Sequence, residues 1–121
     1  MGHQDFKIPP ERERQFDLIA VASEATIKSV RASGRTLEYI YPVVPFVEAD
    51  FSLDAWLFVD TESTLRQYQS GETASALAAE FRAELAKAGY PALWLQGVRC
   101  HFGSKEVVDR DYEGSYYNFL R

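Results

Sequence analysis

The sequence predicts an α+β fold: a two-layer sandwich in which a small mixed or antiparallel sheet of three to five strands packs against a long N-terminal helix and a central pair of helices. Two segments repeat apolar residues every three or four positions, which is the spacing of one helix face. Other segments alternate apolar and polar residues or are rich in β-branched and aromatic side chains, as strands are. A length of 121 residues suits one domain, so we expect residues 11–121 to form it after a flexible tail of residues 1–10.

The first helix is predicted for residues 11–33. It is followed by Gly34, and glycine readily adopts the positive φ that ends a helix. The tail before it has little periodicity and ends in two prolines, so it is left out of the fold prediction. The apolar stripe of this helix comprises Phe16, Ile19, Ala20, Ser23, Ile27 and Val30.

Strands are expected next. Residues 37–41 alternate, and Pro42 should interrupt their strand because proline cannot donate to a sheet ladder. Residues 43–47 are rich in β-branched side chains, but Pro45 restricts them to an edge or bulged strand. Residues 53–60 carry apolar side chains on both faces, which predicts the central strand of the sheet.

The second half begins with a short helix that ends near Gln69 and is capped by Asp60 and Thr61. A longer helix is predicted for residues 73–88, because an apolar stripe runs along it and Gly89 and Pro91 follow. The remaining segments are a strand at residues 92–102, a short helix from Ser104 to Tyr112, and a closing strand at residues 115–120.

The net charge of −5 is concentrated in one segment. Residues 36–65 hold six acidic side chains and no basic one, whereas the rest of the chain is nearly balanced. A nucleic-acid binder needs clustered Lys and Arg, so we expect no nucleic-acid partner. An acidic surface favours a basic protein partner, mainly through the rate of association. The alternative is that these acids only solvate turns and strand ends.

Cysteine content and hydropathy limit the kinds of site and the cellular location that we expect. A single cysteine excludes a disulfide within the chain and a zinc site built from several cysteines. No apolar run approaches the ~20 residues that a membrane span needs, and no leader sequence opens the chain. We therefore expect a cytoplasmic protein without a membrane partner.

Cys100 and His101 are the first candidates for chemistry. An imidazole beside a thiol can activate it as a nucleophile. Neighbouring side chains of a strand point to opposite faces, however, so these two cannot form a dyad there. We expect Cys100 to be a buried structural residue and His101 to lie on the surface with Arg99.

Two further motifs fail for physical reasons. Asp109, Asp111 and Glu113 resemble the opening of a calcium loop, but its essential twelfth ligand would fall on Leu120. Asp60 stands where a helix N-terminus could bind an anion, but no glycine-rich loop precedes it and its own charge would repel a phosphate. The sequence thus predicts no catalytic residue, no metal site and no cofactor.

Tyrosines are more numerous than one small core needs, and exposed tyrosines are common anchors of protein interfaces. We therefore interpret the chain as a non-enzymatic, cytosolic protein-binding domain, one version of which is an acidic inhibitor of the immunity or antitoxin type that neutralises a basic partner. The expected interface comprises Glu48, Asp50, Asp54, Tyr39, Tyr41, Tyr116 and Tyr117.

Two other functions stay open at this point. A small-molecule site or small enzyme could use a pocket between the sheet and the helices, with Glu38, Asp60, Arg99 and His101 as its polar members. A self-assembling structural domain, for example a homodimer, would cover exposed Phe51, Trp56 or Tyr117 with a second copy.

Overall fold

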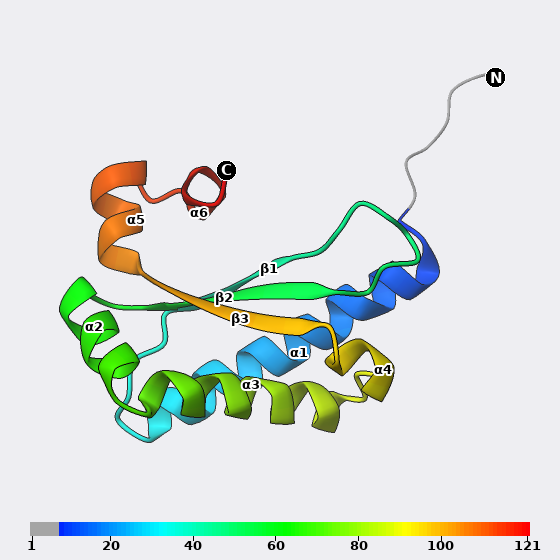
Figure 1. The fold of residues 1–121 in the computed structure, drawn as a ribbon, viewed down its shortest axis with the longest axis horizontal. Coiled ribbons are helices and arrows are strands. Elements are labelled where there is room, and N and C mark those ends of the chain that lie inside the picture. Colours follow the sequence, from blue (N-terminus) through cyan, green and yellow to red (C-terminus); the bar gives the residue numbers. More distant parts are fainter. Residues whose placement is uncertain (1–7) are drawn as a thin grey trace.

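Two long helices lie beneath a three-stranded sheet, and two short helices lie on the other side of it (Figure 1). The computed structural model describes residues 8–121. Residues 1–7 of the expected tail lie outside the described residues, and Pro10 already belongs to the first helix. The elements are α1 (Pro10–Ala32), β1 (Tyr39–Val43), β2 (Leu53–Val59), α2 (Glu62–Ser70), α3 (Thr73–Ala88), α4 (Ala92–Leu95), β3 (Val98–Ser104), α5 (Lys105–Tyr112) and α6 (Tyr116–Phe119).

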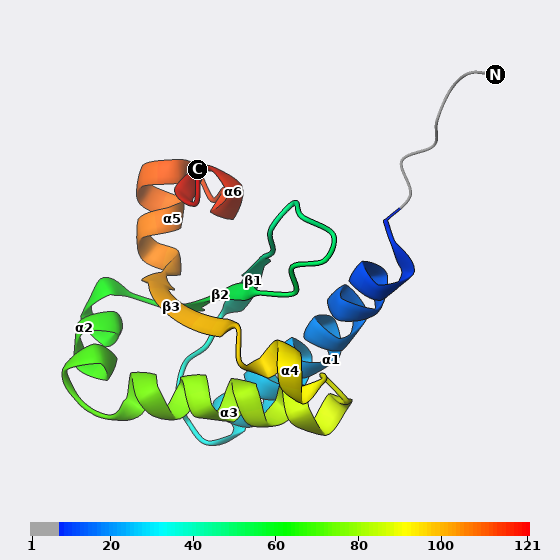
Figure 2. The same cartoon turned by 45° about the vertical axis from the view of Figure 1, so that its right-hand side comes forward.

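The sheet is mixed, with the order β1-β2-β3. β1 and β2 are antiparallel, with Tyr39 opposite Phe58, and β2 and β3 are parallel, with Leu53 opposite Val98. The predicted central strand is therefore confirmed as β2. A second view shows α1 and α3 on one side of the sheet and α5 and α6 on the other (Figure 2).

The core fills the layer between the sheet and the helices α1 and α3. Because side chains alternate along a strand, Leu53, Ala55 and Leu57 of β2 all point to this layer and are fully buried. They meet the buried faces of the two helices. The buried face of α1 is offset from the predicted stripe: Ile19 and Val30 are buried as expected, but Ala22 and Thr26 join them and Ala20 is exposed. The core includes Ile19, Ala22, Val30, Leu37, Ile40, Leu77, Phe81, Leu85 and Val98.

The helix ends follow the expected chemistry. Gly89 has a φ of 101°, the left-handed conformation that ends α3. The Thr61 hydroxyl accepts a hydrogen bond from the Thr64 N–H at 3.1 Å at the start of α2. The Ser104 hydroxyl accepts one from the Val107 N–H at 3.2 Å at the start of α5. Each cap satisfies a backbone donor that has no partner within its helix.

Two predictions about the first strands were wrong. Pro42 does not interrupt β1 but lies within it, opposite Ala55, because β1 is an edge strand and its outer side needs no donor. Residues 44–52 form no strand and connect β1 to β2 as a loop. The carbonyls of Pro45 and Val47 accept hydrogen bonds from the Arg12 side chain instead of from a neighbouring strand.

Two later predictions also need correction. The segment predicted as one strand at residues 92–102 starts as the short helix α4, and its strand begins only at Val98. Residues 115–120 form no strand: Ser115 caps the helix α6 by accepting a hydrogen bond from the Asn118 N–H at 3.1 Å. Helical spacing places Tyr116 and Phe119 one turn apart, and both rings pack on Phe58.

Within residues 8–121, none of the helices combines the length and the apolar character needed to cross a membrane.

Candidate functional site

The side chains that could bind a partner form two surfaces. We call the first the loop surface; it consists of Phe46, Val47, Glu48 and Asp50 in the β1–β2 loop together with Leu93 of α4. We call the second the aromatic face; it is the side of the sheet away from α1 and α3, with Tyr39, Tyr41, Trp56, Phe58 and His101 and the α6 residues Tyr116 and Phe119.

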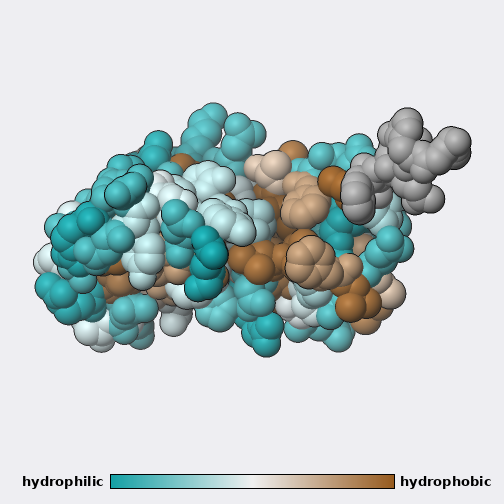
Figure 3. All heavy atoms as spheres, turned by 90° about the horizontal axis from the view of Figure 1, so that it is seen from above, coloured by the Kyte–Doolittle hydropathy of each residue, from teal (hydrophilic) through white to brown (hydrophobic). Residues whose placement is uncertain are grey.

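Apolar side chains are exposed on the loop surface. The exposed fraction is 105% for Phe46, 64% for Val47 and 74% for Leu93. Seen from above, apolar residues gather on the half of the molecule with the β1–β2 loop and α4, whereas hydrophilic residues cover the half with α2 and α5 (Figure 3). An exposed patch of this kind is typical of an interaction site.

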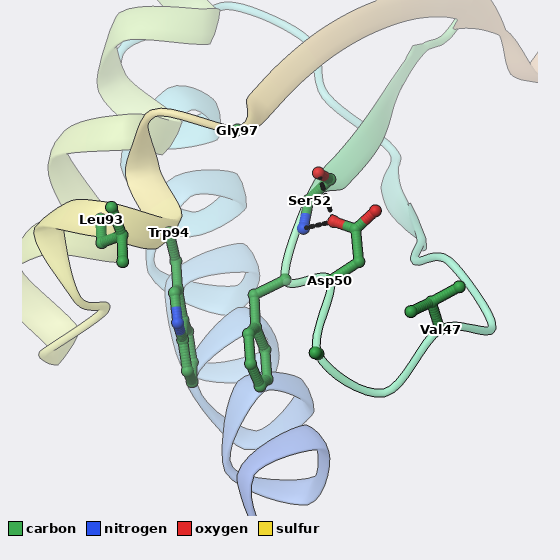
Figure 4. A pocket seen from close by; sticks show the side chains of 8 residues that line it. Val47, Asp50, Ser52, Leu93, Trp94 and Gly97 are labelled. Carbon is green, nitrogen blue, oxygen red and sulfur yellow. Dashed lines mark hydrogen bonds between the residues drawn. The ribbon is translucent and has the colours of Figure 1, made fainter.

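A cavity of about 390 Å³ lies between the loop and α4. Figure 4 shows Leu93 and Trp94 at one wall, Val47 at the other, and the hydrogen-bonded pair Asp50 and Ser52 between them. The Phe51 ring stacks on Trp94 at a centroid distance of 4.2 Å and an interplanar angle of 9°. The loop and α4 therefore form one continuous surface.

Arg12 holds this loop in place from below. Its guanidinium is buried, and Nη2 donates hydrogen bonds to the carbonyls of Pro45, Val47 and Asp50 at 3.2, 2.9 and 2.8 Å. The same guanidinium lies 5.2 Å from the centroid of the Phe51 ring. Three carbonyls of an irregular loop thus share one fixed cation.

Gln15, one turn further along α1, completes this network. Its side chain is fully buried and accepts a hydrogen bond from Arg12. Its amide nitrogen donates to the Phe51 carbonyl at 3.1 Å and to the Tyr90 hydroxyl at 2.9 Å. Because buried polar groups cost free energy when unpaired, this closed network fixes one conformation of the loop.

The predicted acids divide between the two surfaces. Glu48 is exposed in the loop, and Asp50 accepts hydrogen bonds from the side chain and the backbone N–H of Ser52, which lower the pKa of the Asp50 carboxyl. Asp54 lies on β2, on the aromatic face. The structure therefore brings Glu48 and Asp50 together in one loop and places Asp54 on the other surface.

The predicted tyrosines lie mainly on the aromatic face. The Tyr116 ring lies 4.8 Å from Tyr39, 6.4 Å from Tyr41 and 4.6 Å from Phe58, measured between centroids. Tyr117 does not join them, since it is 63% exposed and contacts the guanidinium of Arg121. Three of the four predicted tyrosines are therefore neighbours.

A polar group lies at the edge of the aromatic face. Asp54 Oδ1 is 2.8 Å from His101 Nε2 and accepts from Arg99 Nε at 3.0 Å, and Oδ2 accepts from Arg99 Nη2 at 3.0 Å. Burial alone would raise the pKa of Asp54, but the hydrogen bonds from His101 and Arg99 outweigh it and lower that pKa. The His101 ring also stacks on Trp56 at 4.9 Å.

The four polar residues of the alternative pocket are not brought together. Glu38 pairs with Arg31 at 3.6 Å, and Asp60 accepts hydrogen bonds from Thr36 and Thr61 at the other end of the strands from Asp54. Arg99 and His101 meet at Asp54 instead. The layer between sheet and long helices is filled by core side chains such as Leu57 and Phe81, both fully buried.

Cys100 packs against the core, on the face of β3 opposite to His101, and burial raises the pKa of its thiol. Residues 8–121 contain no group of three His, Cys, Asp or Glu side chains that could hold a metal ion. Of the residues considered for self-assembly, Phe51 and Trp56 are partly covered by their own chain and Tyr117 is exposed.

Sequence reasoning missed Arg12, Phe46 and Leu93. Arg12 is one of several charged residues at the start of α1, and its loop contacts lie 33 to 38 residues away, so no local pattern marks it. Phe46 has β-prone neighbours, which predicted a strand, and so it was not recognised as an exposed loop residue.

No family model matches this sequence, and neither a curated protein nor a solved structure matches it.

Proposed function

We propose that the protein is a binding domain for another protein and that the loop surface is its interface. The observation that carries the proposal is a fully exposed phenylalanine, Phe46, in a loop that the buried Arg12 holds through three carbonyls. Aromatic residues are frequent anchors of protein interfaces. Burying a phenylalanine side chain contributes about 1.5–3 kcal/mol.

The fixed loop makes this anchor effective. A mobile loop would lose conformational entropy on binding, which reduces affinity. Here the loop loses this conformational entropy already when the chain folds, because Arg12 and Gln15 order the loop without a partner. Val47 and Leu93 extend the apolar area on either side of a shallow cavity, into which an apolar side chain of the partner would fit.

The partner is expected to be basic around its apolar contact. Glu48 and Asp50 belong to the loop itself. The loop lies within residues 36–65, which contain acidic but no basic side chains. Opposite charges across an interface speed association and select the partner. An acidic inhibitor of a basic effector, of the immunity or antitoxin type, is one form that such a function takes.

The test compares capture of partners by variants of the intact protein in lysate of the native host. Wild-type protein should retain a basic protein in stoichiometric amount. Phe46→Ala should reduce its retention at least tenfold, because an interface anchor contributes about 2 kcal/mol or more. Glu48→Lys should slow association of the purified pair and reduce its dependence on salt.

Matched controls use exposed residues of α1. Val21→Ala removes an apolar side chain that is 55% exposed, and Glu24→Lys makes the same change in charge as Glu48→Lys. Both should bind as the wild type does. Equal capture by the Phe46→Ala and Val21→Ala proteins would refute the loop surface as the interface.

A further inference from the structure

The aromatic face contains a second cavity, of about 590 Å³. This volume is within the range of small-molecule sites. Its walls come from all three strands and from the α5–α6 segment, so residues distant in the sequence meet there. The lining residues are Val43, Asp54, Trp56, His101, Tyr112, Phe119 and Leu120.

Aromatic rings form most of the wall. Phe119 meets Trp56 edge to face at 5.7 Å and Tyr112 edge to face at 5.4 Å, so its ring is supported on two sides. Val43 and Leu120 add aliphatic surface. Flat apolar walls of this kind suit a planar ring, which gains dispersion contacts and aromatic packing there.

His101 supplies one directed polar group. The Asp54 carboxylate can only accept hydrogen bonds, so the His101 Nε2 that faces it at 2.8 Å carries the hydrogen. In the neutral imidazole Nδ1 is then an acceptor, and it makes no hydrogen bond to any of residues 8–121. Stacking on Trp56 fixes the plane of this ring.

The charges of the cavity are already compensated. Asp54 receives two hydrogen bonds from Arg99 in addition to the one from His101. The pair of Asp54 and Arg99 carries no net charge, so neither a cation nor an anion finds an unpaired opposite charge there. A neutral ligand therefore fits better than a charged one.

We propose that this cavity binds a neutral, planar aromatic molecule with one hydrogen-bond donor, which donates to Nδ1 of His101. The site uses the aromatic face and not the loop surface, so it does not depend on the proposed protein-binding function. Asp54 positions the imidazole, and Trp56 and Phe119 contact the ligand ring.

The test uses the intact wild-type protein and two probes, 2-naphthol and 2-methoxynaphthalene, which differ in the hydroxyl donor. Binding is followed by NMR through the ring nitrogens of His101, because the chain has only two histidines. We expect 2-naphthol to shift the Nδ1 signal and to bind about three- to tenfold more tightly than its methyl ether, the equivalent of one net hydrogen bond. Equal affinity of the two probes, or no shift at His101, would overturn the proposal.

Variants locate the site. His101→Phe keeps an aromatic ring but removes the acceptor, and it should bring the affinity for 2-naphthol down to that for the ether. Phe46→Ala serves as the control for apolar adsorption on the loop surface and should leave binding unchanged. Loss of 2-naphthol binding in Phe46→Ala would refute this cavity as the site while leaving the protein-binding proposal to its own test.

Discussion

Replacing Arg12 by methionine tests the origin of the ordered loop. Methionine keeps a long apolar side chain in the same place but removes the guanidinium. The carbonyls of Pro45, Val47 and Asp50 then lose the donor that they share, and Gln15 loses one partner of its buried side chain. The substitution therefore removes the polar network with little change in apolar packing.

The magnitude follows from these contacts. A hydrogen bond to a charged group contributes about 1.5–3 kcal/mol. The contributions of the three carbonyls do not add, because the exposed loop can turn them to water once it is released. We expect Arg12→Met to lower the free energy of unfolding by about 2–3 kcal/mol. With a urea dependence of about 1.5–2 kcal/mol per molar for a chain of this size, the midpoint falls by about 1–2 M.

Arg14→Met is the matched control. Arg14 is an exposed residue of the same helix, and its guanidinium lies 5.6 Å from the centroid of the Trp94 ring. A cation–π contact at an exposed site contributes about 0.5–1 kcal/mol, so this variant should lose no more than that. A loss in Arg12→Met as small as in Arg14→Met would show that the guanidinium does not hold the loop.

Two other predictions concern the aromatic face. Gly103→Ala should lower the free energy of unfolding by about 1–3 kcal/mol in urea denaturation, because the added Cβ would lie only 2.8 Å from Cε1 of the buried Phe58 ring. Asp54→Asn should destabilise the protein at neutral pH, measured as a fall in the thermal midpoint. The folded pKa of Asp54 lies below its ordinary 3.8, so the carboxylate stabilises the fold above that pH and loses this effect as the pH falls below it. The difference between wild type and variant should therefore shrink in acid.

Each of these predictions has a control on the same chain. Gly71→Ala places its Cβ at an ordinary 3.6 Å from the Gln67 carbonyl and should change stability by less than about 0.5 kcal/mol. If Gly103→Ala changes the free energy of unfolding as little as Gly71→Ala does, the contact of the added Cβ with Phe58 does not destabilise the protein. Asp17→Asn, at an exposed position of α1, should have the same thermal midpoint as the wild type at neutral pH. A constant deficit of Asp54→Asn from neutral to acid pH would contradict a role for the charged carboxylate.

The parts of the fold that were predicted are those in which local pattern and burial agree. The stripe of α3 and one face of β2 bury their periodic residues in one core, whereas the buried face of α1 shares only Ile19 and Val30 with its predicted stripe. Gly89, Thr61 and Ser104 marked helix ends because capping depends on only a few neighbouring residues. The opposite orientation of Cys100 and His101 followed from strand geometry alone.

The parts that were missed depend on contacts between distant residues. Residues 115–120 have the composition of a strand, but α6 forms because Tyr116 and Phe119, one helical turn apart, pack on Phe58. Likewise, residues 43–47 have β propensity, but Arg12 provides hydrogen bonds that a neighbouring strand would otherwise supply. β propensity depends on such surroundings, so composition alone could not decide either segment.

In the candidate site, too, the sequence indicated what depends on local composition and missed what depends on contacts between distant residues. The sequence indicated an acidic segment and a group of tyrosines, and the structure places Tyr39, Tyr41 and Tyr116 side by side. It could not indicate that Asp54, Arg99 and His101 would meet, because this depends on the parallel register of β2 and β3. That register is fixed by the core on the opposite face of the sheet.

The parallel pairing of β2 and β3 has a consequence during synthesis on the ribosome. β2 can join β1 as soon as β2 itself has emerged, but its other edge stays without hydrogen-bond partners until α2, α3 and α4 have been translated and β3 follows. The nascent chain therefore carries an open apolar strand edge over this interval, and such edges pair readily with other chains. Slow translation between β2 and β3 would prolong this state, so protein yield should be sensitive to codon usage in that interval.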